Sequence, residues 1–306
     1  MKNRIPFREK LNPFTTVLLI VFSSAALFFA FLTYRQALAV INREFDKAPA
    51  ADTPVPKEHN IVKTNPWRQE ETVLQETEDA GTAYLDTILF FGDSNTVRFL
   101  SFDNGEGRTY ITKKNTAAVV GMGIQAIDSL KCMVFQSGQK TMVETAGLLK
   151  PGRILITMGT NNLRGSSTDA SKFISVYEEK LKKIQAASPE SGMIVNAIPL
   201  CAEKRKYRNV YIEQIRAYND AIRAMCERNG WKFLNSSEAL IDENTGYAKK
   251  EYIEADGIHL NRQGVAAMFS YIRTHAWMRD RDDYTVFDAS DVIGPITTMY
   301  SSDPLK

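Results

Sequence analysis

ILFFGDSNTVRFL, residues 88–100, joins an apolar run to a small polar turn and then to a second apolar pattern. The run over 88–92 is apolar at successive positions, which is typical of a parallel strand buried on both faces. Gly92, Asp93 and Ser94 then interrupt it. This turn either only redirects the chain or exposes the Ser94 hydroxyl for chemistry, and taken alone it favours the first interpretation.

Four further apolar runs resemble the first, and segments with helical spacing alternate with them. The predicted strands cover 86–92, 116–121, 152–160, 191–199 and 230–237. In the segment 208–229, Ile215 follows Ile212 by three residues and Ile222 follows Ile215 by seven, which places all three on one face of a helix. This alternation predicts an open α/β sheet of about five parallel strands. We also expect helices over 126–135 and 138–150, between the second and third strands.

The uncharged run 14–34 is the clearest compositional feature of the N-terminus. As a helix it would be about 30 Å long, enough to cross a bilayer. Basic residues are denser before it than after it, which predicts a cytoplasmic tail over 1–13 and an extracytoplasmic location for the remainder. The alternative is a secreted protein, because Ala37–Ala39 resembles a signal-peptidase site and would be cleaved near Ala39.

Composition divides the rest of the chain into a linker, a domain and a tail. Prolines are frequent between the anchor and residue 82, so 35–82 is predicted to be an extracytoplasmic stalk. The α/β pattern fills 83–280, and the polar segment 281–306 follows as a C-terminal extension.

Charge and cysteine content exclude several functional classes. The formal net charge is +2 and no long block of like charge occurs, so nucleic acid is not expected as a partner. Cys132, Cys201 and Cys226 are far apart and form no CxxC pair, which excludes a zinc ribbon and a disulfide framework. We expect neither a metal nor a cofactor.

Polar residues and glycines follow several predicted strands, and others precede the last predicted helix. They are Ser94, Gly121, Gly123, Asn161, Asp256 and His259. Ligands bind at the carboxyl ends of the strands in an open parallel sheet, so these residues are expected to converge there. A hydroxyl, backbone N–H groups, a carboxamide, a carboxylate and an imidazole are the groups needed for acyl transfer through a serine nucleophile.

Each group has a chemical role in such a reaction. His259 can remove the proton that makes Ser94 a poor nucleophile, and Asp256 can fix the tautomer of the imidazole. The Ser94 backbone N–H, a glycine N–H and the Asn161 carboxamide can donate to the oxyanion that develops in the reaction. Gly123 is the preferred glycine, and Gly121 is the alternative.

Four sequence blocks in this order resemble the SGNH hydrolase superfamily, also called GDSL esterases, over residues of about 86–278. They are Gly92-Asp93-Ser94, the glycine Gly123, Gly159-Thr160-Asn161-Asn162, and Asp256-Gly257-Ile258-His259. The family usually has aspartate where this chain has Asn162. The resemblance implies a flavodoxin-like, three-layer α/β/α fold and an acyl-ester hydrolase or an O-acyltransferase. The motif GxSxG is absent, which argues against the α/β-hydrolase fold.

The function predicted from the sequence is a membrane-anchored, extracytoplasmic serine esterase. Its expected substrates are small acyl esters, O-acetyl above all, on cell-envelope or extracellular glycans. The polar residues Asn95, Arg98, Asn162 and Arg164 are expected on the rim of the substrate cleft. Two alternatives stay open: an O-acyltransferase that uses the same residues, and a catalytically silent module that binds glycans or acts as a scaffold.

Overall fold

Five parallel strands form the central sheet of the protein. The computed structural model describes residues 72–207, 209–277 and 284–298. The strands are β1 (Ile88–Gly92), β2 (Thr116–Ala118), β5 (Arg153–Thr157), β6 (Gly192–Asn196) and β7 (Lys232–Leu234), in the order β2-β1-β5-β6-β7. Every residue of β1, β5 and β6 is buried, which explains the apolar residues at the centre of each strand. The predicted five-stranded parallel sheet is confirmed.

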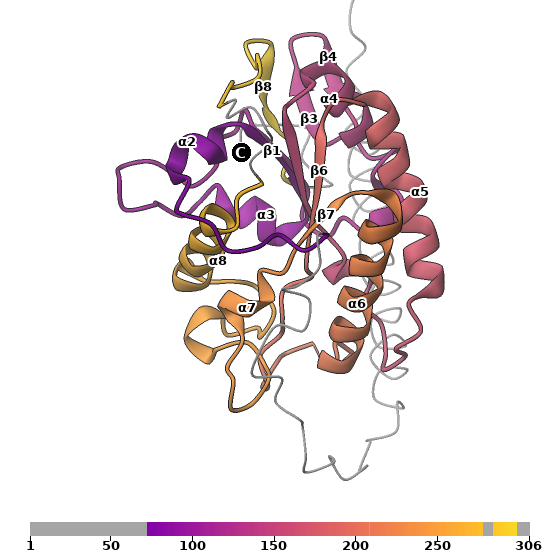
Figure 1. Cartoon of the computed structure of the whole chain (residues 1–306), viewed down its shortest axis with the longest axis vertical. Helices are drawn as coiled ribbons and strands as arrows, with labels where there is room; N and C mark the ends of the chain where they lie inside the picture. The colour runs from indigo at the N-terminus through magenta and orange to yellow at the C-terminus, as the bar shows by residue number, and fades with distance from the viewer. Residues whose placement is uncertain (1–71, 208, 278–283, 299–306) are drawn as a thin grey trace, which may run out of the picture. The chain divides into compact units, whose positions relative to one another are not determined.

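Helices cover both faces of this sheet (Figure 1). One layer contains α4 (Met142–Leu149), α5 (Ser171–Ala187) and α6 (Ile212–Asn229). The other contains α2 (Gly81–Asp86), α3 (Ser94–Phe99), α7 (Ser237–Leu240) and α8 (Arg262–Thr274). The arrangement is the expected three-layer α/β/α fold.

The strand order places a switch point beside β1. From β1 the chain continues to β2 on one side of it, and the later strands β5, β6 and β7 follow on the other side. Gly92 at the end of β1 pairs with Thr157 at the end of β5. Ligands of open α/β sheets bind at such a point, and Ser94 comes two residues after Gly92.

A second, antiparallel sheet contradicts the helices expected over 126–135 and at the start of 138–150. It consists of β3 (Met133–Phe135), β4 (Gly138–Lys140) and β8 (Val292–Pro295), in the order β4-β3-β8. Met133 and Phe135 are buried in this sheet. The reason is long-range pairing: β8 comes from the C-terminal extension, far from β3 in the sequence, and local spacing carries no information about it.

The folded unit also begins earlier than residue 83. Val73 pairs with Phe233 of β7 in a parallel bridge, and Leu74 donates a backbone hydrogen bond to the Phe233 carbonyl (3.0 Å). Both side chains are buried. The last part of the predicted stalk therefore packs on the edge of the central sheet.

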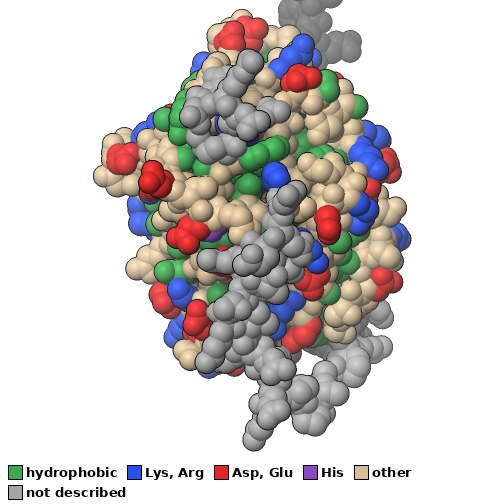
Figure 2. All heavy atoms as spheres, viewed as in Figure 1, with side chains coloured by type: hydrophobic (Ala, Val, Ile, Leu, Met, Phe, Trp, Pro, Cys, Tyr) green, Lys and Arg blue, Asp and Glu red, His purple; other side chains and the backbone are tan. Residues whose placement is uncertain are grey.

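The remaining sequence features are the anchor, the cysteines and the surface charges, and the structure describes the last two. The anchor predicted over 14–34 lies outside the described residues, and no helix within the described ranges has the length and apolarity to cross a membrane. Cys132, Cys201 and Cys226 are buried and free. On the face drawn in Figure 2, acidic and basic side chains of the described residues are interspersed.

Candidate active site

Ser94 is the first residue of α3, directly after the turn that follows β1. Asp93 caps this helix, since its Oδ1 accepts a hydrogen bond from the backbone N–H of Asn95 (3.1 Å). A Cβ atom on Gly92 would overlap the Thr96 side chain and lie 2.9 Å from the Thr157 carbonyl. The strand can therefore turn directly into the helix only with glycine at this position, which leaves Ser94 at a helix N-terminus.

The side chains of Ser94, His259 and Asp256 form one hydrogen-bonded chain. The Ser94 Oγ lies 2.8 Å from His259 Nε2, and His259 Nδ1 lies 2.6 Å from Asp256 Oδ2. Asp256 can only accept when ionised, so Nδ1 carries the proton and Nε2 is free to accept from the Ser94 hydroxyl. This is the tautomer that a general base beside a serine requires.

Asp256 is held in its ionised form by the turn that contains it. Burial raises the pKa of its carboxyl, but hydrogen bonds from His259 and Ile258 outweigh this and hold the pKa below its ordinary value. Its Oδ1 accepts from the backbone N–H groups of Ile258 (2.9 Å) and His259 (3.0 Å). The carboxylate thus fixes both the imidazole and the backbone that carries it.

The backbone N–H groups of Ser94 and Gly123 have no acceptor among the described residues, and the same is true of Gly121. Gly123 is buried, whereas Gly121, the alternative, is exposed. The neighbouring Met122 carbonyl accepts a hydrogen bond from Asn161 Nδ2 (3.1 Å). Met122 lies between the two glycines, so this hydrogen bond places both beside Asn161, and it is burial that distinguishes Gly123 from Gly121.

Asn161 connects this segment to the nucleophile turn. Its Nδ2 donates to Asp93 Oδ2 (3.3 Å) as well as to Met122, so both of its N–H groups have acceptors. Asp93 is fully buried, and burial raises the pKa of its carboxyl to about 6. The orientation of the Asn161 amide is thus set by a carboxylate next to Ser94, and donation to an oxyanion requires one of these hydrogen bonds to be shared or exchanged.

Asn162, which stands where the family usually has aspartate, uses both ends of its amide. Its Oδ1 accepts from the Ile124 backbone N–H (3.1 Å), and its Nδ2 donates to Gln125 Oε1 (3.0 Å). A carboxylate could make the first of these hydrogen bonds but has no hydrogen for the second. Asparagine at this position links the Gly123 loop to the Asn161 loop.

A family model described as the GDSL-like Lipase/Acylhydrolase family matches residues 90–267, more than half of the chain. The chain belongs to this family. The matched region contains Ser94, Asn161 and His259, and the resemblance to the SGNH/GDSL superfamily inferred from the sequence blocks is confirmed. Among curated proteins, no relative matches the chain.

Solved structures with a similar fold share little sequence with this GDSL-like family member. A GDSL-like lipase from Bacteroides thetaiotaomicron is 16% identical, with 60% of this chain and 84% of that chain covered and a TM-score of 0.44. An acetyl xylan esterase is 19% identical, with 60% of this chain and 96% of that chain covered and a TM-score of 0.43. The lipase/acylhydrolase from Enterococcus faecalis is 15% identical, with 60% of this chain and 92% of that chain covered and a TM-score of 0.42.

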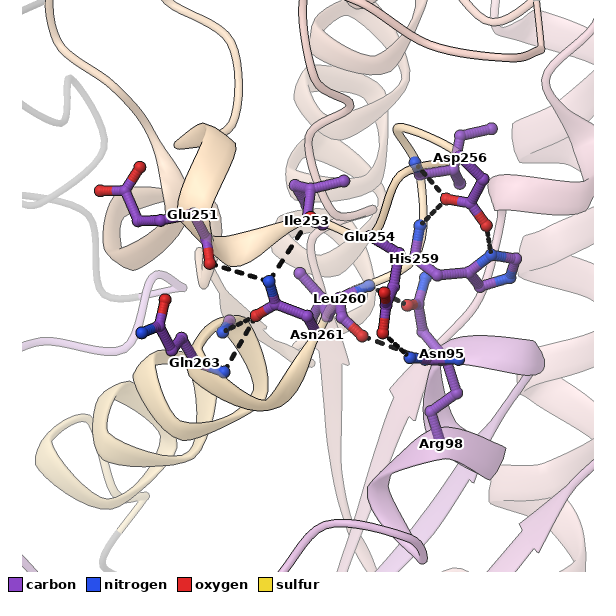
Figure 3. A network of polar contacts seen from close by, with 12 residues as sticks. Asn95, Arg98, Glu251, Ile253, Glu254, Asp256, His259, Leu260, Asn261 and Gln263 are labelled. Carbon is purple, nitrogen blue, oxygen red and sulfur yellow. Dashed lines mark hydrogen bonds and ion pairs between the residues drawn. The ribbon is translucent and has the colours of Figure 1, made fainter.

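Asn95 and Arg98, expected on the substrate rim, instead hold the loop that carries His259 (Figure 3). Asn95 is fully buried, and its Oδ1 accepts from the Leu260 backbone N–H (3.1 Å). Arg98 Nε donates to the Leu260 carbonyl (3.0 Å), and its guanidinium pairs with Glu254. The helix that begins at Ser94 is thereby tied to the residue that follows His259.

The same loop is held from its other side by the segment 202–206. The backbone N–H of Ala202 donates to the Gly257 carbonyl, and that of Lys206 donates to the Asp256 carbonyl, both at 2.9 Å. Gly257 has φ +81°, and a Cβ there would lie 2.5 Å from the Arg205 Cα. The sequence pattern gives no signal for this contact, because the two segments are linked only through the tertiary fold.

We expect Arg98→Ala to lower kcat about tenfold and to leave KM nearly unchanged. A catalytic group displaced by about 1 Å can lose up to about 10²-fold in rate, and Arg98 fixes the backbone next to His259. Steady-state kinetics on an aryl acetate measure both constants. Arg108→Ala is the matched control, because Arg108 pairs with Asp86 instead of with the His259 loop, and it should leave kcat within about twofold. Equal losses in the two variants would contradict the positioning role.

A pocket of ≈ 500 Å³ adjoins the site. It is lined by Ile124, Gln125, Asn161, Asn162, Arg164, Asp169, Lys172, Phe173, Val176 and Tyr218. Asn162 and Arg164 are thus the two members of the predicted rim that the structure places at a pocket. Its remaining walls come mainly from the N-terminal part of α5 and from α6, where helical spacing alone does not reveal which side chains share a cavity.

Proposed function

We propose that this GDSL-like family member is a serine esterase that hydrolyses small acyl esters, with Ser94, His259 and Asp256 as its triad. The observation that carries the proposal is the continuous chain of hydrogen bonds from the Ser94 hydroxyl through the imidazole to Asp256. A serine at a helix N-terminus with such a partner is the arrangement that nucleophilic acyl transfer needs.

The first half of the reaction forms an acyl-enzyme. His259 Nε2 takes the Ser94 proton while Oγ bonds to the ester carbonyl carbon, and the carbonyl oxygen becomes an oxyanion. When this intermediate collapses, the C–O bond to the alcohol breaks and His259 gives its proton to the leaving oxygen. Asp256 stabilises the imidazolium that exists between the two transfers and does not itself take the proton.

The oxyanion is proposed to be bound by the Ser94 and Gly123 backbone N–H groups and by Asn161. Removal of one such donor typically costs about 10²- to 10³-fold in kcat. Support comes from the two backbone groups that have no acceptor within the described part of the chain. In the second half, His259 takes a proton from a water molecule whose oxygen bonds to the acyl carbon. The bond between that carbon and Ser94 Oγ then breaks, His259 returns the proton to Oγ, and the carboxylic acid leaves. In the O-acyltransferase alternative, a sugar hydroxyl attacks in place of water.

The natural substrate and the location are further parts of the proposal. We propose O-acetyl esters on cell-envelope or extracellular glycans, processed outside the membrane by a domain that residues 14–34 anchor. The uncharged run and the charge bias around it support the location. A scaffold module that only binds glycans remains the alternative from a different functional class.

The decisive experiment treats the full chain in detergent with a fluorophosphonate and maps the adduct by mass spectrometry. We expect about one adduct per chain, on Ser94, together with hydrolysis of 4-nitrophenyl acetate that the reagent abolishes. Heat-unfolded protein is the control for non-specific labelling. Absence of hydrolysis, or labelling distributed over several serines, would contradict the esterase assignment. Analysis of the products in the presence of soluble oligosaccharides separates hydrolysis from acyl transfer.

A further inference from the structure

The ≈ 500 Å³ pocket beside Asn161 has the size of a small-molecule site and the placement of a substrate subsite. Asn161 belongs both to the pocket and to the network around Ser94, so a substrate bound at Ser94 can extend into it. Neither His259 nor Asp256 lines the pocket. It therefore offers room for a substituent of the ester beyond the reacting carbon.

One wall of the pocket is held by hydrogen bonds between side chains and backbone. Asn162 donates to Gln125 Oε1 (3.0 Å) and accepts from the Ile124 backbone N–H (3.1 Å). These bonds join the loop after β2 to the loop after β5. The wall nearest to the proposed oxyanion donors is thus fixed before any ligand binds.

The floor of the pocket is aromatic. The rings of Phe173 on α5 and Tyr218 on α6 stack with their centroids 4.6 Å apart and an interplanar angle of 25°. Both residues are more than nine-tenths buried, so little of each ring faces the pocket. The floor is therefore made by two rings that are themselves packed in the core.

The loop that carries Arg164 is tied to the buried Gln214 of α6. Gln214 is 1% exposed, and its Nε2 donates to the carbonyls of Ser167 (2.7 Å) and Arg164 (3.4 Å). The Gly165 backbone N–H also donates to the Asn209 carbonyl (3.1 Å). Arg164 is therefore attached to a fixed backbone at the pocket.

The charged groups at the pocket are predominantly positive. Arg164 and Lys172 both line it, and no described carboxylate lies within ion-pair distance of either. Asp169 is the one acidic residue in the lining, and its Oδ1 accepts from the Ser171 backbone N–H (2.9 Å), a bond that lowers the pKa of its carboxyl. Two unpaired cations therefore face one anion that is already hydrogen-bonded.

We infer that this pocket binds an anionic group, a carboxylate or a phosphate, that the substrate carries near its scissile ester. Arg164 and Lys172 would contact the anion, above the floor of Phe173 and Tyr218. The inference rests on the proposed esterase function, since it concerns what accompanies the ester at Ser94. The anion can belong to the acyl part, as in a dicarboxylic half-ester, or to the alcohol part, as in an acidic sugar.

Matched esters test the inference and separate these two sources. Mono-4-nitrophenyl adipate carries its carboxylate on the acyl side, and 4-acetoxy-3-nitrobenzoate carries it on the alcohol side. The methyl esters of both are the neutral counterparts. We expect a higher kcat/KM for the anionic member of one pair, with the preference reduced at high salt because the groups are exposed to solvent.

Variants then assign the preference to the two cations. Arg164→Gln and Lys172→Gln should each lower kcat/KM for the preferred anionic ester about two- to fivefold, the range of an exposed ion pair. The loss of kcat/KM on the neutral ester should be smaller than the loss on the anionic ester. Lys182→Gln is the matched control, because Lys182 lies on the same helix but pairs with Glu178 and does not line the pocket. Intact hydrolysis with no anion preference in either pair, or a preference that survives both substitutions, would overturn the inference.

Binding to the Ser94→Ala variant separates this inference from the esterase function. Isothermal titration calorimetry measures the affinity of the preferred anionic ester without turnover, and Arg164→Gln should weaken it about two- to fivefold. If the wild-type protein hydrolyses none of the esters but binds an anionic ester with an affinity that depends on Arg164, the esterase function is disproved and the anion-binding site is supported. Equal affinity for anionic and neutral esters would disprove the anion site.

Discussion

Replacement of His259 by alanine should lower kcat for ester hydrolysis by about 10⁵- to 10⁶-fold. Without Nε2 2.8 Å from the Ser94 hydroxyl, no described side chain is hydrogen-bonded to that hydroxyl to take its proton or to protonate the leaving alcohol. Removal of the serine or the histidine alone costs about as much as removal of all three triad members in a serine protease. Steady-state hydrolysis of 4-nitrophenyl acetate by the full chain measures the loss.

The partner variant Asp256→Asn should lower kcat by about 10⁴-fold. An amide can present a hydrogen to Nδ1, which selects the tautomer whose Nε2 cannot accept from Ser94. In the proposed triad His259 and Asp256 act as one unit, so the double variant should be less than about tenfold slower than His259→Ala alone. Multiplicative losses in the double variant would show that the two residues act independently.

His275 provides the control for both variants. It is buried and stacks on Tyr271 with ring centroids 3.6 Å apart, so His275→Ala should lower the melting temperature. Its side chain contacts Thr274 and Tyr271 at the C-terminal end of α8, and kcat should stay within about twofold. A similar loss of activity in His275→Ala would indicate that His259→Ala lowers activity by disturbing the fold and not by removing a catalytic group.

The sequence predicts the central sheet well because each strand is marked locally. β1, β5 and β6 are buried on both faces, so the centre of each is a run of apolar residues, and polar residues stand only at the ends of β5 and β6. The sheet of β3, β4 and β8 is not marked in this way. Its strands are three or four residues long, and Met133 finds its partner Pro295 only through the fold.

The candidate site shows the same division between local and long-range information. Ser94, Asn161 and His259 could be placed at one edge because each follows or precedes a predicted element. Asn95 and Arg98 are three residues apart and share a face of α3, which the sequence does indicate. It does not indicate that this face meets Leu260, so the sequence alone favours the rim for both residues.

Asp93→Asn should remove the loss of folding stability that the buried, ionised Asp93 carboxylate causes at neutral pH. Burial raises the pKa of the Asp93 carboxyl from its ordinary value of 3.8 to about 6. Between these values the folded protein holds the proton and the unfolded chain has released it. The free energy of unfolding contributed by Asp93 therefore falls as the pH rises from about 4 through 6, by up to about 3 kcal/mol.

The variant lacks this titration, so its stability relative to the wild type should increase by up to about 3 kcal/mol from pH 4 to pH 8. Urea denaturation of both proteins at the two pH values measures the difference, and lost hydrogen bonds that do not depend on pH cancel in it. Asp169→Asn is the control. Asp169 is exposed and the Ser171 backbone N–H lowers the pKa of its carboxyl below 3.8, so its titration lies mostly below pH 4 and this variant should show little change in relative stability between pH 4 and pH 8.

The same Asp93→Asn variant should be about 10²-fold slower in kcat, with KM nearly unchanged. Asp93 Oδ2 accepts from the Asn161 amide, and an asparagine that keeps its oxygen on the Asn95 N–H would turn its own NH₂ toward that amide. A misdirected Asn161 loses part of the stabilisation that one oxyanion donor provides. A more stable but slower enzyme would explain why a buried carboxylate stands before Ser94. Gained stability at pH 8 with unchanged kcat would show that Asp93 does not position Asn161 for catalysis.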